Sequence, residues 1–329
     1  MKLKTCFTAL LAALVITSIT QASDITWRAT TAYQANSNSG IAFKAMAQQL
    51  SELSSGTFKL DINSGGSLGF KNGDNFEVVG DGIVEVAETL SGSLVGVDPI
   101  FGFLSLPFVT SSPKDVQKII SISFATFSKI FESNNQKLIG WGSFPVVGVY
   151  AKHPSYDLKG LKDLKIRTYD AFGAKAFREL GAAPVQLPWG DVVSSLSSGV
   201  ISAVLTSSEG GVGTNIWDLG MTDFSCIGYS TPITFLHISK EAFENLSSAH
   251  KEAVLSAGKS FTKANWEAAQ QRVATNLKTL SKNGIKIHEN IDKELKTKIE
   301  QIALSFAAEW TKKVGPEGQA LADKFFTKK

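Results

Sequence analysis

The sequence predicts an α/β protein whose two lobes are joined by one long helix, and three observations support this fold class. The chain has 329 residues, and a single hydrophobic core rarely extends past roughly 250–300 residues, so two lobes are expected. Strand-like and helix-like segments alternate along most of the chain, which favours sheets with helices on both faces. Residues 247–283 contain no proline and keep a helical spacing of apolar side chains.

The first third of the chain consists of short strands that alternate with amphipathic helices. Residues 58–62 alternate apolar and polar side chains with a period of two, which indicates a half-buried strand. Residues 40–53 instead place apolar side chains three or four positions apart, as one face of a helix requires. Similar patterns predict strands at residues 27–31 and 85–89 and helices at residues 75–82 and 113–132.

A second unit of strands and helices follows the first. Gly181 and Pro184 end one of its helices, and after Pro232 residues 233–238 form a strand that can return to the first sheet. The remaining predicted strands lie at residues 137–141, 146–150, 164–167, 201–205 and 285–287, and the remaining helices at residues 171–180, 189–199 and 291–310.

The long helix has a start signal and a stop signal. Ser247 or Ser248 can cap its beginning, and Asn283-Gly284 marks its end. At 1.5 Å per residue, about 37 residues extend ~55 Å, so we expect this helix to cross both lobes. The alternative is two helices broken at Gly258. On the first interpretation, residues 23–144 with 233–270 form the first lobe and residues 145–232 with 271–329 form the second.

Residues 1–22 have the pattern of a secretory signal peptide. Two lysines precede an uncharged apolar run at residues 6–19, and Thr20-Gln21-Ala22 supplies the small residues of a cleavage site. A transmembrane anchor is the alternative, but the run is shorter than the ~20 residues that span a bilayer. Cys6 would leave with this segment and Cys226 would remain alone. A secreted chain of this size without an intramolecular disulfide points to the bacterial periplasm.

The charge balance argues against a nucleic-acid-binding surface. The chain has 33 Lys+Arg and 30 Asp+Glu residues, a net charge of +3. A surface that follows phosphates needs clustered cations, which this sequence lacks. Removal of residues 1–22 takes away two lysines and lowers the net charge to +1, so bulk charge says little about a ligand.

The sequence carries no motif for catalysis, for a metal or for a cofactor. The four histidines, His153, His237, His250 and His288, lack the spacing of metal ligands. No Gly-x-Ser-x-Gly segment is present, and Gly211-Val212-Gly213 is not followed by the third glycine of a dinucleotide loop. We therefore expect no cofactor, and we expect that the chain is not an enzyme.

Five segments in the same order resemble one protein family. Residues 157–167 (DLKGLKDLKIR) are similar to its DLKGLKIR segment, residues 179–185 (ELGAAPV) to its ALGAxPV, and residues 187–200 (LPWGDVVSSLSSGV) to its xPFSEVYxALQxGVVDG. GGSLG at residues 65–69 and LPF at residues 106–108 also match. With the signal peptide and the long helix, the chain resembles the DctP-like solute-binding proteins of tripartite ATP-independent periplasmic (TRAP) transporters.

This resemblance implies a two-lobed periplasmic binding protein fold with a long interlobe helix. It also implies that a small organic anion is bound between the lobes and delivered to the membrane subunits of a TRAP permease. We expect a periplasmic monomer without a nucleic-acid partner. Two alternatives stay open: a solute-binding protein of an ATP-driven transporter, and a secreted α/β enzyme.

Arg167 is the main candidate for binding an anion. It ends a predicted strand and precedes a helix that begins near Ala171, so the positive end of that helix favours an anion beside the guanidinium. Arginine also matches a carboxylate with two parallel hydrogen bonds. In the family, the arginine of this motif holds the ligand carboxylate, and Arg167 is its match. Without the resemblance, a solvated surface arginine is the simpler interpretation.

The sequence departs from the family pattern at two places. Phe144 stands near the position of a second basic residue that many members have, and Thr206 replaces the amide of the family's DGQENP segment. Both changes favour a monocarboxylate with an apolar or aromatic body over a dicarboxylate or a sialic acid. We expect Glu209 to face solvent or an amine of the ligand. Besides Arg167, the candidate ligand-binding residues are Phe144, Tyr33, Thr206, Trp189, Phe70, Ser91, Trp141, Phe172 and Ser207, although core packing is the alternative for each aromatic ring.

Overall fold

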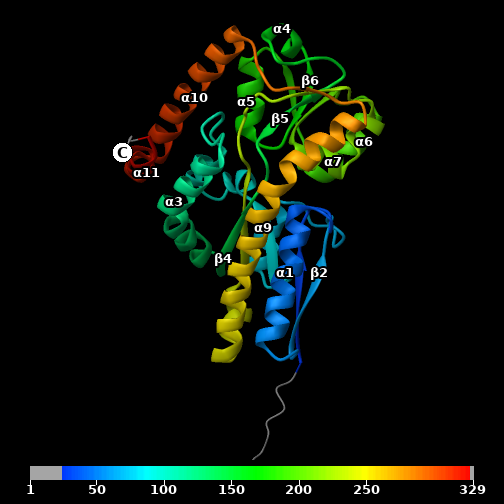
Figure 1. Cartoon of the computed structure of the whole chain (residues 1–329). Helices are drawn as coiled ribbons and strands as arrows, with labels where there is room; N and C mark the ends of the chain where they lie inside the picture. Colours follow the sequence, from blue (N-terminus) through cyan, green and yellow to red (C-terminus); the bar gives the residue numbers. More distant parts are fainter. Residues whose placement is uncertain (1–23, 327–329) are drawn as a thin grey trace, which may run out of the picture.

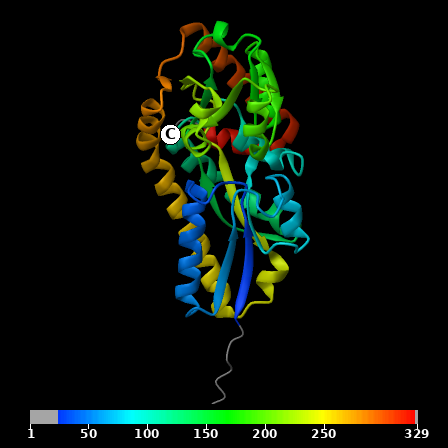
Figure 2. The same cartoon turned by 90° about the vertical axis from the view of Figure 1, so that its right-hand side faces the viewer.

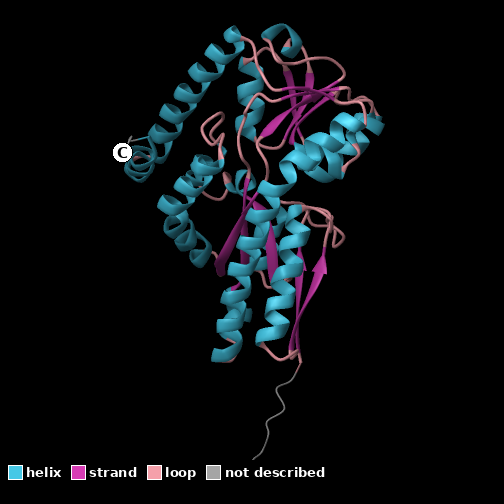
Figure 3. Cartoon of the chain, in the orientation of Figure 1, coloured by secondary structure: helices cyan, strands magenta, loops and turns pink. Residues whose placement is uncertain are grey.

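The computed structural model describes residues 24–326 and contains two sheets, one at each end of an elongated molecule (Figures 1 and 2). Helices lie against both sheets, as Figure 3 shows, and the predicted α/β class is confirmed. The predicted signal peptide at residues 1–22 lies outside the described residues. Within those residues, no helix is both long enough and apolar enough to cross a membrane.

The first sheet has the strand order β2-β1-β3-β10-β4. β1 pairs in parallel with β2 and β3, whereas β10 pairs antiparallel with β3 and β4. The strand predicted after Pro232 therefore returns to the first sheet. Its elements are β1 (Ile25–Thr30), α1 (Asn38–Leu53), β2 (Phe58–Asn63), α2 (Asp74–Gly80), β3 (Val86–Leu90), η1 (Ser91–Leu94), η2 (Pro99–Ser105), α3 (Pro113–Ser133), β4 (Gln136–Ser143), β10 (Ile233–Ser239) and α8 (Lys240–Glu244).

The second sheet has the order β11-β9-β5-β8-β6-β7. The helix predicted at residues 189–199 begins as a short 3₁₀ turn and is α-helical only over α6, and the short glycine-rich helix α7 was not predicted. The elements are β5 (Val147–Ala151), α4 (Leu158–Leu161), β6 (Lys165–Thr168), α5 (Ala171–Glu179), β7 (Ala183–Gln186), η3 (Trp189–Asp191), α6 (Val192–Ser197), β8 (Ala203–Ser207), α7 (Ser208–Gly213), η4 (Ile216–Leu219), β9 (Asp223–Ser225) and β11 (Lys286–His288).

The long helix α9 (Ser248–Lys282) is continuous, so the alternative of two helices broken at Gly258 is wrong. The side chain of Ser247 caps its start by accepting a hydrogen bond from the His250 N–H. Gly258 serves close packing, because a Cβ there would lie 2.6 Å from the carbonyl oxygen of Ile139. The helix contacts α1 and β4 at one end and α7 and β11 at the other, and it therefore spans both sheets (Figure 1).

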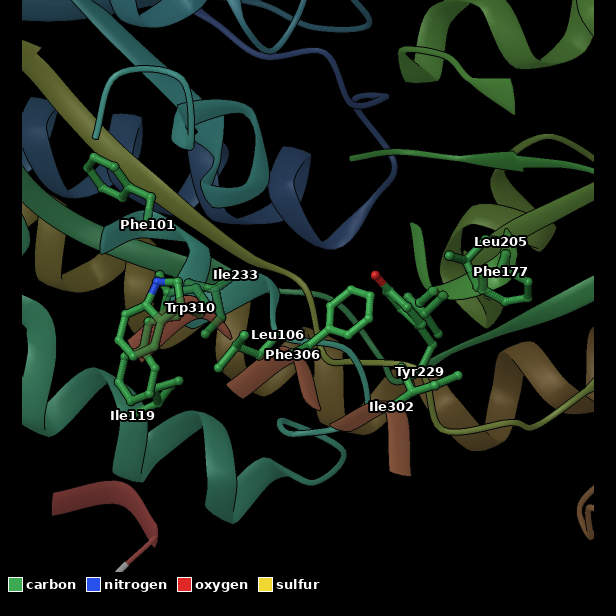
Figure 4. Packing of buried hydrophobic residues seen from close by; sticks show 14 of the residues in the cluster. Phe101, Leu106, Ile119, Phe177, Leu205, Tyr229, Ile233, Ile302, Phe306 and Trp310 are labelled. Atoms are coloured by element: carbon green, nitrogen blue, oxygen red, sulfur yellow. The ribbon is translucent and has the colours of Figure 1, made fainter. Parts of the chain in front are cut away.

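The largest hydrophobic core also extends across both ends of the molecule. Figure 4 shows Phe101 and Ile119 at one end of this cluster and Phe177 and Leu205 at the other. The C-terminal helices α10 (Lys293–Val314) and α11 (Pro316–Phe326) contribute to it. Although the sequence places them in the second lobe, α10 contacts η2 and α11 contacts α3. The exact lobe boundaries stay a prediction.

Two extended segments connect the sheets beside α9. One runs from β4 to β5 and the other from β9 to β10. They are hydrogen-bonded to each other, since the Phe144 N–H donates to the Pro232 carbonyl at 3.0 Å and the Val147 N–H donates to the Ser230 carbonyl at 2.8 Å. Phe144 and Pro232 thus lie where any movement between the sheets must bend the chain.

Candidate ligand-binding site

A cavity of about 120 Å³ lies between the two sheets. Its wall is built from the loops after β1 and β2, from the two connecting segments, from the second sheet and from α9. This volume is well under the roughly 300–1,000 Å³ of pockets for drug-sized ligands, so the cavity suits a compact molecule. The lining residues are Tyr33, Gln34, Asn36, Ser37, Asn72, Leu90, Phe144, Val147, Arg167, Tyr169, Trp189, Thr206, Ser207, Glu209, Gly210, Val212, Gly213, Thr214, Pro232 and Arg272.

Arg167 lies in this wall at the end of β6, and only 3% of its surface is exposed. Its Nε donates to the Leu187 carbonyl at 2.9 Å and its Nη1 donates to the Leu205 carbonyl at 3.2 Å. The guanidinium carbon lies 5.5 Å from the ring centroid of Trp189 and 5.8 Å from that of Tyr169. Two carbonyls and two aromatic rings therefore fix the orientation of the guanidinium.

Arg167 forms no salt bridge among residues 24–326, although the nearby Asp170 carboxylate partly opposes the lowering of its pKa by burial. Burial lowers the pKa of Arg167 to about 10, so the side chain is still a cation at neutral pH. No carboxylate of the described chain lies within ion-pair distance of it, and its Nη2 group has no hydrogen-bond partner there. A buried and unpaired cation costs several kcal/mol, and a bound anion would remove that cost.

The helix end near Arg167 differs from the expectation. The sequence suggested that a ligand anion would lie between Arg167 and the start of α5. In the structure, the Asp170 carboxylate occupies the helix start, where it accepts a hydrogen bond from the Gly173 N–H at 2.7 Å. An anion at Arg167 must therefore be held by the guanidinium and not by this helix end.

The first-sheet side of the cavity presents an aromatic pair and an amide. The rings of Tyr33 and Phe144 have centroids 4.5 Å apart. Burial raises the pKa of the Tyr33 hydroxyl, so this group stays protonated and can donate a hydrogen bond. The buried Oδ1 of Asn72 has no hydrogen-bond partner in the described part of the chain. These groups belong to the first-sheet side of the cavity, whereas Arg167 comes from β6 of the second sheet.

Glu209 is placed differently from the expectation that it faces solvent or a ligand amine. It is 5% exposed, and its Oε2 accepts hydrogen bonds from Arg272 Nε at 2.9 Å and from Asn276 Nδ2 at 2.7 Å. Its Oε1 accepts a hydrogen bond from the Asn38 N–H at 3.3 Å. The carboxylate therefore joins α7 to α9 and to the start of α1. No local pattern indicates this contact, because Arg272 and Glu209 lie 63 positions apart.

The structure brings six of the ten predicted site residues to the cavity. They are Arg167, Phe144, Tyr33, Thr206, Trp189 and Ser207. Thr206 and Trp189 approach each other closely over Gly210, where a Cβ would lie 2.3 Å from Thr206 Oγ1. Asn72, Tyr169, Glu209 and Arg272 also line the wall and were not among the predicted residues. Tyr169 is two residues from Arg167 and Asn72 is two residues from Phe70, so both could have been found from their positions.

The other four predicted residues lie outside the cavity wall. Trp141 packs against Trp266 of α9, with ring centroids 5.5 Å apart, and Phe172 packs 6.0 Å from Phe306 of α10. Ser91 is 1% exposed at the start of η1, and Phe70 is half-buried in the loop before α2. Core packing, the alternative for each aromatic ring, describes where Trp141 and Phe172 lie. The physical reason is that both rings have apolar partners on helices far along the chain.

The site offers binding groups and no arrangement for metal chemistry. Within residues 24–326, no three His, Cys, Asp or Glu side chains cluster as metal ligands would. The buried imidazole of His237 contacts Thr89 Oγ1 at 2.7 Å, and burial lowers its pKa to about 3. It lies in the first sheet and does not line the cavity.

Residues 29–309 match the family model of bacterial extracellular solute-binding proteins, family 7, known as DctP. The chain belongs to this family. It is therefore a TRAP solute-binding protein, which takes part in transport and is not an enzyme. Proteins of this family are periplasmic receptors that work with membrane permease components. The recognition made from the five sequence segments is confirmed.

Individual relatives are similar along most of their length. A solute-binding protein of Chromohalobacter salexigens is 23% identical over 291 residues, which cover 87% of this chain and 85% of the relative. The C4-dicarboxylate-binding protein DctB of Bacillus subtilis is 25% identical over 292 residues, which cover 85% and 77%.

A solved structure shares the two-lobed architecture. It is an extracytoplasmic solute receptor of Bordetella pertussis that binds pyroglutamic acid. Its TM-score is 0.87 at 25% identity, and the match covers 92% of this chain and 99% of that one. The predicted two-lobed fold is thereby confirmed.

Proposed function

We propose that this TRAP solute-binding protein captures a compact organic monocarboxylate with a largely apolar or aromatic body, and that Arg167 binds the carboxylate. One observation carries the proposal: Arg167 is a buried cation at the cavity wall that forms no salt bridge in the described chain. A ligand carboxylate supplies a negative charge and accepts hydrogen bonds from the free N–H groups of the guanidinium. Pyroglutamic acid, which the receptor of Bordetella pertussis binds, has this chemistry.

Aromatic rings support the apolar part of the proposal. Tyr33, Phe144, Tyr169 and Trp189 surround the cavity, and the hydroxyls of Thr206 and Ser207 add only neutral polar contacts. Phe144 lies where many family members have a second basic residue, so a second carboxylate finds no partner there. A C4-dicarboxylate, as bound by the Bacillus subtilis relative, fits this wall less well.

We further propose how the receptor reaches and serves its transporter. Residues 1–22 are removed as a signal peptide during export, and the mature monomer delivers its ligand to the TRAP permease subunits from the periplasm. The lobes close by bending the segments at Phe144 and Pro232. Sequencing the N-terminus of the exported protein tests cleavage, and light scattering tests the monomeric state.

Isothermal titration calorimetry tests the role of Arg167. Loss of two hydrogen bonds to a charged group costs about 3–6 kcal/mol, so Arg167→Ala is expected to raise the Kd of the tightest acid by roughly 10²–10⁴-fold. Arg178→Ala is the matched control, because Arg178 is exposed on α5 and does not line the cavity. An unchanged Kd in Arg167→Ala would contradict the proposal.

A further inference from the structure

A second arginine reaches the same cavity, and its charge is already balanced. Arg272 enters the wall from α9, and its Nε donates to Glu209 Oε2 at 2.9 Å. The two side chains differ in exposure, at 32% for Arg272 and 4% for Glu209. The carboxylate is thus fixed inside the protein, while the guanidinium keeps an accessible side. Its Nη1 and Nη2 groups have no hydrogen-bond partner among the described residues.

The protein itself saturates the carboxylate of Glu209. Asn276 Nδ2 donates to Oε2 at 2.7 Å, and the Asn38 N–H at the start of α1 donates to Oε1 at 3.3 Å. These donors come from α9 and α1, which pack side by side, and α9 also contacts α7 directly (Figure 1). Because Arg272 and Glu209 form a salt bridge, their formal charges cancel and the two side chains together act as a neutral pair.

The residues that line the cavity therefore carry a formal net charge of +1, from Arg167, Arg272 and Glu209. Arg167 supplies this charge, and the pair of Arg272 and Glu209 adds none. A ligand with one carboxylate neutralises the cavity. A second carboxylate would approach an arginine whose charge is already compensated and would be repelled by the buried Glu209.

We propose that Arg272 and Glu209 form a charge-neutral second binding element, which donates hydrogen bonds to an uncharged acceptor of the ligand and rejects a second carboxylate. A lactam carbonyl or a hydroxyl is such an acceptor. Arg272 contacts the ligand, and Glu209 is a positioning residue that holds the guanidinium and cancels its charge. This inference rests on the proposed function, because it concerns the same cavity and the same bound acid.

A purely structural role for the pair leads to a different expectation. If Glu209 only joined α7 to α9, its removal would weaken all ligands by the same factor. If it cancels the charge of Arg272, its neutralisation leaves a free cation in the cavity. The ratio of affinities for a dicarboxylate and a monocarboxylate then changes, and this ratio is the quantity to measure.

Calorimetry with glutarate and L-pyroglutamate on the wild type and Glu209→Gln measures that ratio. Glutamine keeps the size of the side chain and removes its charge. We expect the wild type to prefer L-pyroglutamate, and the variant to shift the ratio toward glutarate by roughly 10-fold or more. Asp223→Asn is the matched control. Asp223 is buried in the second sheet, where its Oδ1 lies 2.7 Å from His288 Nε2, and it does not line the cavity. The ratio of affinities in Asp223→Asn should therefore equal that of the wild type.

Arg272→Gln tests the same inference if Glu209→Gln does not fold. The variant leaves Glu209 without its cation, which weakens all acids alike. Loss of the guanidinium should therefore weaken L-pyroglutamate roughly 10-fold or more beyond its effect on cyclopentanecarboxylate, which lacks the ring carbonyl. Equal weakening of both acids would overturn the inference.

The outcomes separate this inference from the proposed function. An unchanged ratio in Glu209→Gln, or a wild type that binds glutarate as tightly as L-pyroglutamate, overturns the inference alone. The inference alone is also overturned if the wild type binds neither glutarate nor L-pyroglutamate but binds another acid through Arg167. If no organic acid binds in a manner that depends on Arg167, the proposed function fails as well.

Discussion

The buried carboxyl of Asp170 should weaken folding as the pH rises from about 4 to 6. Burial raises its pKa from 3.8 to about 6, although the hydrogen bond from the Gly173 N–H opposes this shift. Because the pKa is higher in the folded state, the native protein holds this proton more tightly than the unfolded chain. Stability from this group is complete below pH 4 and is lost as the pH rises through 6. A shift of about two pKa units corresponds to about 3 kcal/mol.

Asp170→Asn isolates this effect, since asparagine caps a helix about as well as aspartate. Urea unfolding at several pH values should show the variant gaining about 3 kcal/mol over the wild type between pH 4 and 7. The difference between the two proteins is the relevant quantity. His237, whose pKa burial lowers to about 3, destabilises both proteins equally as the pH falls below 6.5.

Asp157→Asn provides the control for the capping role. Asp157 caps α4 by accepting a hydrogen bond from the Gly160 N–H at 2.6 Å, but it is only half-buried. Comparison of the two variants separates the loss of a capping carboxylate from the loss of a buried one. The reasoning is refuted if the Asp170→Asn difference is flat, or if it falls as the pH rises.

Two further predictions concern packing. Gly258→Ala should destabilise the protein by about 1–3 kcal/mol in thermal unfolding, because the new Cβ would lie 2.6 Å from the Ile139 carbonyl oxygen. Gly213→Ala is the control and should not destabilise the protein, because the space beside Gly213 is open. A fully stable Gly258→Ala would show that α9 does not pack this closely. Trp189→Ala should weaken acid binding by roughly 2- to 30-fold through loss of the ring beside Arg167. Trp217→Ala, outside the cavity, should leave the Kd unchanged, and equal effects of the two substitutions would argue against a contribution of the Trp189 ring.

Local patterns were enough to predict the elements that carry the site. The spacing of apolar residues predicts α9 almost to its ends, and a strand followed by a helix start places Arg167 at the end of β6. The segments around Arg167 also indicated the family. These features are encoded in short stretches of sequence, so they can be found without knowledge of tertiary contacts.

Long-range contacts explain what the sequence could not predict. Nothing local distinguishes Trp189, whose ring faces Arg167, from Trp141 and Phe172, whose rings pack on α9 and α10. The buried place of Glu209 depends on a partner 63 positions away. The helix break considered at Gly258 was wrong. The absence of a side chain at Gly258 allows α9 to pack closely on Ile139 of β4, and helix propensity alone does not indicate such a contact.

The central claim is that a ligand carboxylate balances the buried charge of Arg167. Mass spectrometry of the intact protein, purified from the periplasm without denaturation, tests it most directly. The account predicts a bound organic acid with a single carboxylate, which is absent from Arg167→Ala prepared in the same way. A bound molecule without a carboxylate, or an acid retained equally by Arg167→Ala, would contradict it.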